Sequence, residues 1–274
     1  MKSNTYLKAF SGLSCLLTLS LLISCASGGV STKAGIHEPG ADNDPACASM
    51  LQRIAGINAG APATISTSFT ADGVSGGQKF KLEGTARFDR KGYYSISVLD
   101  YVFRSRVLDA YRSMDTLYFF YPAEKRLLID DIKSIDIYRY TGFKTEFSFL
   151  FDLLTGGVPL ITGGTIARCV PGDGDSCSIV VENSDYMQSI FMKAGIPEKI
   201  MLVHRLSKDR LEIYLKSHIT RDNCIFFTNI RIVAPERNIS VNIKFSGTAL
   251  NGAVKVESFN PGSLKKGTEI IRVN

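Results

Sequence analysis

The segment Gly73–Gly77 reads GVSGG and fits the G-x-S-x-G pattern in which a serine acts as the nucleophile. That chemistry needs the serine on a sharp turn between a buried strand and a helix, with a histidine nearby. Here Ser75 lies between two stretches of alternating apolar and polar residues, which predict strands joined by a hairpin turn. The three histidines are scattered, at His37, His204 and His218. We therefore expect a turn here and a protein that is not an enzyme.

Other chemistry-bearing patterns are equally weak. Asp130 and Asp131 are adjacent on a predicted strand, so their carboxylates face opposite sides and cannot act as a pair. No C-x-x-C or Cys/His spacing suggests a metal site, and no phosphate-binding loop occurs, so we expect neither metal nor cofactor. The net charge of +6 is mild, and no basic run with interleaved aromatic residues points to nucleic acid.

Cys25 stands where a lipid could be attached. Lysines at positions 2 and 8 and an apolar run at 9–23 predict a signal peptide, because the run is shorter than the ~20 residues of a membrane span. Leu22-Ile23-Ser24-Cys25 resembles the lipobox of bacterial lipoproteins, in which the thiol takes a diacylglycerol group and becomes the acylated N-terminus. We expect a signal peptide at 1–24, a flexible tether at 25–44 and a lipid anchor carrying chains such as palmitate on Cys25.

The remaining four cysteines suggest disulfides in an oxidising compartment. Cys169 and Cys177 flank a turn-rich segment, so two strands meeting across it would bring them together. We expect the pairs Cys169–Cys177 and Cys47–Cys224, while the two other pairings remain open.

The segment from 45 to 274 predicts one mainly β domain. Asp44-Pro45 opens a short helix, and from residue 63 the apolar period changes to two. Ten to twelve antiparallel strands are expected, with a weak final strand at 254–262 and a loosely held end. The pattern breaks at 143–155, where apolar residues recur at helical spacing until Gly156-Gly157.

Two segments carry alternative interpretations. The helix at 143–155 is either an ordinary core helix or a lid over an apolar cavity formed by a strongly curved sheet. In the turn segment at 99–107, the apolar residues Tyr101, Val102 and Phe103 either contact a membrane or partner, or fold back onto the core.

The order of these elements resembles the LolA/LolB lipoprotein carrier and receptor superfamily. The segments at 84–131 and 147–160 carry the resemblance. It implies an incomplete, unclosed antiparallel β-barrel with an N-terminal helix and an internal helical lid, which holds acyl chains in its hollow. It also implies that residues 101–103 form the loop that delivers cargo to the bilayer, although here Arg104 and Arg106 follow closely and the small glycine-containing turn is missing.

The sequence thus predicts a lipid-anchored protein of the bacterial envelope, on the outer rather than the inner membrane because Ala26 follows the cysteine. Its partners would be membrane lipid through Cys25 and the acyl chains of lipoproteins or a periplasmic carrier. The alternative is a non-enzymatic scaffold that binds proteins. We expect acyl ligands to contact Phe80, Leu82, Phe88, Phe147, Leu150, Phe151 and Leu154.

Overall fold

The computed structural model describes residues 45–132, 135, 145–254, 256, 259–264 and 266–273. Cys25 and the tether predicted at 25–44 lie outside these residues, so the predicted signal peptide, tether and domain boundaries stay predictions. In the described part of the chain, no helix is both long and apolar enough to cross a membrane.

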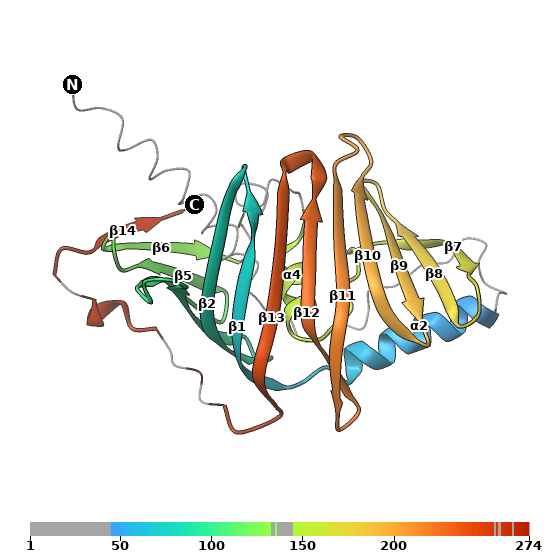
Figure 1. Ribbon diagram of the computed structural model, residues 1–274, viewed down its shortest axis with the longest axis horizontal. Coiled ribbons are helices and arrows are strands. Elements are labelled where there is room, and N and C mark those ends of the chain that lie inside the picture. Colours follow the sequence, from blue (N-terminus) through green and yellow to red (C-terminus); the bar gives the residue numbers. More distant parts are fainter. Residues whose placement is uncertain are drawn as a thin grey trace.

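One strongly curved sheet of 14 strands dominates the molecule (Figure 1). Its order is β14-β6-β5-β4-β3-β2-β1-β13-β12-β11-β10-β9-β8-β7, so it ends in two edges and does not close. The bounds are β1 Thr64–Ser75, β2 Gln78–Asp89, β3 Tyr93–Asp100, β4 Arg106–Ser113, β5 Thr116–Tyr121, β6 Arg126–Asp131, β7 Thr165–Pro171, β8 Ser176–Glu182, β9 Tyr186–Lys193, β10 Ile196–His204, β11 Arg210–Arg221, β12 Cys224–Ala234, β13 Ile239–Leu250 and β14 Glu269–Arg272.

Two α-helices accompany the described sheet. The first, α2, spans Pro45–Ala59, and the second, α4, spans Phe147–Leu154. Figure 1 shows α4 behind β12 and β13 and α2 along the lower ends of the strands near β9 and β11. The 3-10 turns η1, Pro235–Arg237, and η2, Pro261–Ser263, complete the elements. The predicted unclosed antiparallel sheet with an N-terminal and an internal helix is confirmed.

Short hairpins explain most of the topology. Every neighbouring pair except β14 with β6 is antiparallel, and β1 joins the two halves by pairing with both β2 and β13. The turn between β1 and β2 is Gly76-Gly77 with φ of 56° and 82°, which glycine adopts without a Cβ clash. The predicted hairpin is therefore confirmed, but its turn is shorter than the GVSGG segment, because Gly73–Ser75 belong to β1.

The C-terminal end differs from the prediction. No strand occurs among the described residues of 254–262, and the final strand is β14, which pairs in parallel with β6. Phe259 stacks on Tyr111 at 4.8 Å and lies 5.1 Å from Tyr118 between ring centroids. The tail is thus held by Phe259 on β4 and β5 and by the pairing of β14 with β6, and it is not loosely held.

Candidate functional site

The helix α4 fills the space on the inner side of the sheet. Six of its eight residues are buried and apolar: Phe147, Phe149, Leu150, Phe151, Leu153 and Leu154. Phe151 meets Phe88 of β2 edge to face, with 5.8 Å between ring centroids. A helix with apolar residues on nearly all sides must be covered on several sides, and here β1, β2 and β13 provide part of the cover.

The predicted ligand-contacting residues lie in this one core. Leu82, Phe88, Phe147, Leu150, Phe151 and Leu154 are buried in it, and Phe80 is half-buried and packs against it. The void left between α4 and strands β1, β2 and β13 is only about 10 Å³. A void of that size holds no more than one water molecule. The structure therefore brings the predicted residues together in one packed core. The void beside Leu154 is too small for an acyl chain while α4 stays in place.

Two buried or half-buried amides hold the segment that follows α4. Asn58 of α2 accepts a hydrogen bond from the Val158 amide at 2.6 Å and donates one to the Val158 carbonyl at 3.0 Å. Gln188 of β9 donates to the Pro159 carbonyl at 2.6 Å and accepts from the Ile161 amide at 3.0 Å. Each side chain satisfies both a donor and an acceptor of the backbone, so the C-terminal side of α4 is firmly attached to α2 and β9.

Asp152 is the acidic residue of α4. Burial raises the pKa of its carboxyl to about 6, and the positive charge of Arg90 opposes this rise only in part. Arg90 itself donates to the Ala61 carbonyl at 3.1 Å, beyond the end of α2. The charged form of Asp152 is therefore disfavoured when α4 is packed in place.

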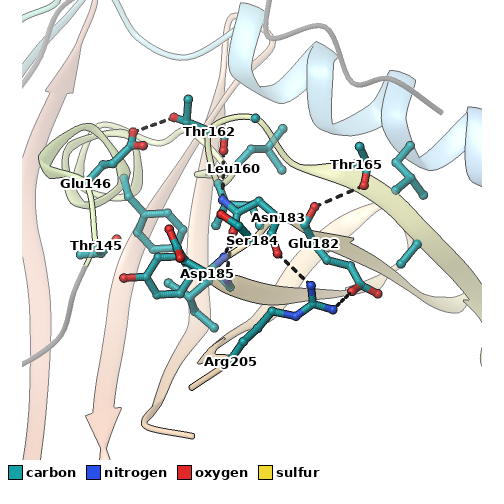
Figure 2. A pocket seen from close by; sticks show the side chains of 17 residues that line it. Thr145, Glu146, Leu160, Thr162, Thr165, Glu182, Asn183, Ser184, Asp185 and Arg205 are labelled. Carbon is teal, nitrogen blue, oxygen red and sulfur yellow. Dashed lines mark hydrogen bonds and ion pairs between the residues drawn. The ribbon is translucent and has the colours of Figure 1, made fainter. Parts of the chain in front are cut away.

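An open cleft of about 690 Å³ lies at the N-terminal end of α4 (Figure 2). Thr162 donates to the Glu146 carboxylate at 2.6 Å, and Asn183 donates to the Thr162 carbonyl at 3.0 Å. Arg205 donates to the Asn183 carbonyl at 3.0 Å and forms an ion pair with Glu182. These bonds join the residues before α4 to the turns at β7, β8–β9 and β10–β11.

The pKa of Tyr186 reflects the burial and the negative charges in this cleft. The pKa of its phenol is raised to about 12, first by burial and then by the negative charges of Asp185 and Glu146. Burial and the two nearby carboxylates therefore disfavour ionisation of the phenol. His204 packs edge to face against the Tyr186 ring, at 5.3 Å between centroids.

The loop between β3 and β4 holds its apolar residues in solvent. Tyr101, Val102 and Phe103 are 40%, 75% and 82% exposed, so they do not fold back onto the core. The Asp100 carboxylate accepts hydrogen bonds from the Val102 and Phe103 amides at 2.9 and 2.7 Å. Arg104 forms an ion pair with Glu83 at 2.6 Å. The loop is thus an ordered hairpin connection with its apolar tip outward.

The predicted disulfide pairs are wrong. Cys177 and Cys224 are free thiols, whereas Cys169 is disulfide-bonded. In the β7–β8 ladder Cys177 lies opposite Pro171 and Cys169 opposite Ile179, so the hairpin does not place the two cysteines in register. The side chain of Cys47 lies outside the described residues.

The other candidate chemistry does not assemble. Ser75 pairs with Gln78 at the end of the β1–β2 ladder, whereas His204 and His218 lie on β10 and β11. His204 shares a contact of 3.0 Å between its Nδ1 and the Ser207 Oγ in a surface turn. Asp130 is buried and Asp131 is exposed, on opposite faces as expected. No group of three or more metal-ligating side chains occurs in the described residues.

Sequence reasoning missed the amides Asn58 and Gln188 and the cleft residues Glu146, Asp185, Tyr186 and Arg205. The cleft residues come from three separate segments, so no local motif marks them. One signal was available for Gln188, because a polar residue among apolar ones on a buried strand face indicates a specific hydrogen-bonding role.

Comparisons with known proteins identify the fold. No family model and no curated protein matches the sequence. A solved structure of a DUF1329 family protein from Desulfovibrio piger has a TM-score of 0.57 at 10% identity, covering 81% of this chain and 100% of that one. A LolA superfamily protein from Nitrosomonas europaea has a TM-score of 0.50 at 8% identity, covering 79% and 97%. An outer membrane lipoprotein-sorting protein domain from Vibrio parahaemolyticus has a TM-score of 0.50 at 9% identity, covering 76% and 93%.

These likenesses show that the chain shares the open, curved sheet of LolA superfamily proteins. The expected resemblance is therefore confirmed at the level of the fold.

Proposed function

We propose that this protein is a lipid-anchored, non-enzymatic protein of the bacterial envelope that binds an acyl chain beneath α4 in lipoprotein or lipid handling. The observation that carries the proposal is the packing of α4, whose six buried apolar residues occupy the inner side of a sheet that does not close. The fold shared with a lipoprotein-sorting domain supports the same class of cargo.

Binding requires α4 to move, because the void between Leu154 and strands β1, β2 and β13 is only about 10 Å³. The hydrogen bonds of Asn58 and Gln188 to the backbone of residues 158–161 hold the C-terminal side of α4. The open cleft lies at the N-terminal end of the helix. We infer that α4 swings about its C-terminal end. An entering acyl chain then replaces the apolar contacts of α4, at about 25 cal/mol per Å² of apolar surface removed from water.

The lipid anchor on Cys25 and the loop at 101–103 would place the protein at its membrane. Phe103 and Val102 are among the most exposed large apolar residues of the described chain, and Lys81 lies 3.6 Å from the centroid of the Tyr101 ring. Apolar side chains beside basic ones suit an interface of acyl chains and anionic headgroups. The outer membrane is the expected location, and the lipoprotein substrate or periplasmic carrier is the expected partner.

The filled core also favours a second function. If α4 never leaves the sheet, the molecule is a scaffold that binds protein partners through its surface.

Native mass spectrometry of the mature protein, extracted from membranes in mild detergent, tests the first function against the second. A co-purified mass equal to an acyl lipid supports the first function. A ligand-free chain in a stable complex with another protein supports the second. A Cys25→Ser variant tests the anchor separately, because it should move from the membrane to the soluble envelope fraction.

A further inference from the structure

The cleft beside α4 has an apolar floor. Phe149 of α4 is both a buried core residue and a wall of the cleft, so the floor continues directly into the packing of α4. The volume of about 690 Å³ lies within the usual range of small-molecule sites. The large apolar residues that line it are Phe149, Leu160, Ile161, Ile166 and Leu202.

The polar lining carries an excess of negative charge. Arg205 is paired with Glu182, which leaves the carboxylates of Glu146 and Asp185. Within the described chain neither forms an ion pair, and Glu146 accepts hydrogen bonds only from the hydroxyls of Thr162, at 2.6 Å, and Ser148, at 3.2 Å. These hydroxyls orient the Glu146 carboxylate without neutralising its charge.

The charged groups lie on two sides of the cleft. Figure 2 shows Glu146 and Asp185 on the side where α4 begins and the Arg205–Glu182 pair on the other side. Tyr186 lies close enough to Asp185 and Glu146 for both to act on its phenol. A carboxylate pair beside an aromatic ring stabilises a protonated amine by charge and by the ring's negative face.

We propose that this cleft binds the protonated amine of the same ligand whose acyl chain lies beneath α4, so that the cargo is an aminolipid with the headgroup chemistry of phosphatidylethanolamine. The inference rests on the proposed function. The ammonium contacts Glu146 and Asp185. The shared Phe149 wall explains why a lipid fits better than a basic peptide, since the amine site and the chain site meet there.

Isothermal titration calorimetry on the mature chain at pH 7.5 tests this, with dihexanoylphosphatidylethanolamine compared with dihexanoylphosphatidylglycerol. We expect the amine lipid to bind about tenfold more tightly, as two charge-assisted contacts provide. The double variant Glu146→Gln/Asp185→Asn should bring the ratio near one, because it keeps the shape and removes both charges. The control Asp222→Asn lies in the exposed β11–β12 turn and should keep the wild-type ratio.

A wild-type ratio of one or less overturns the inference, as does a ratio that the double variant leaves unchanged; acyl binding would still stand in both cases. If neither lipid binds, the proposed function falls together with the inference. Binding of a lysine-rich peptide without binding of either lipid would overturn the inference in favour of a peptide site.

Discussion

Replacing Asp152 by asparagine should stabilise the protein at neutral pH. Burial raises the pKa of this carboxyl from 3.8 to about 6, so the folded state binds a proton more readily than the unfolded chain between these values. Stability from this group is present below the unfolded pKa and is lost as the pH rises through the folded pKa. Above about pH 6 the wild type therefore carries a penalty that Asp152→Asn does not.

The size of this penalty follows from the shift. The rise of the Asp152 pKa from 3.8 to about 6 sets a ceiling of ~3 kcal/mol on the free energy of unfolding that the charge costs. Asp152 is partly exposed, so solvent screening reduces the expected gain to about 1–2 kcal/mol at pH 7.5. Urea unfolding followed by far-UV circular dichroism measures it, and the difference should narrow toward zero as the pH approaches about 4. A variant less stable than wild type at pH 7.5 would refute this account of the residue.

The same substitution probes α4 as a lid. If α4 leaves the sheet to admit a ligand, Asp152 regains water and its normal pKa, so opening becomes easier as the pH rises. A fluorescent fatty acid should then bind the wild type more tightly at pH 7.5 than at pH 5. The asparagine variant should lose this pH dependence and bind about 5–30-fold more weakly at pH 7.5, by the same 1–2 kcal/mol.

Three other substitutions test the remaining elements. Asn58→Ala removes both hydrogen bonds to Val158, so it should lower the free energy of unfolding by about 1–3 kcal/mol and speed hydrogen exchange of the Val158 amide; unchanged exchange would contradict the clamp. Phe103→Ser should reduce co-sedimentation with anionic vesicles several-fold without altering the melting temperature, whereas Met114→Ser, at the β4–β5 turn, should bind like wild type. Leu154→Ala should cost about 2–4 kcal/mol in urea unfolding, and a cost below ~1 kcal/mol would mean that Leu154 is not packed as described.

The sheet was predictable because its signals are local. In β2, the alternation of Leu82, Ala86 and Phe88 with polar residues indicates which face is buried. The glycine-rich segment before β2 indicates a hairpin turn. The internal helix was equally predictable, since Phe147, Leu150, Phe151 and Leu154 recur at helical spacing. The loop at 101–103 was recognisable because apolar residues occupy a turn that usually carries polar ones.

The failures involve contacts between distant segments. The pairing of β14 with β6 brings together segments more than a hundred residues apart, and four residues give too short a pattern to reveal it. The cysteine pairing depended on hairpin register, which sequence does not fix for Cys169 and Cys177. The cleft depends on the relative placement of Glu146, Asp185 and Arg205, which only the folded sheet determines.

A photo-crosslinking measurement tests the central claim, that an acyl chain lies between α4 and the inner side of the sheet. A fatty acid with a diazirine near its chain end would be equilibrated with the mature protein, irradiated and mapped by peptide mass spectrometry. We predict that label is concentrated on the peptides containing 80–88 and 147–154, and that excess unlabelled fatty acid abolishes it. Saturable label confined to exposed surface peptides, with none on these two, would contradict the account.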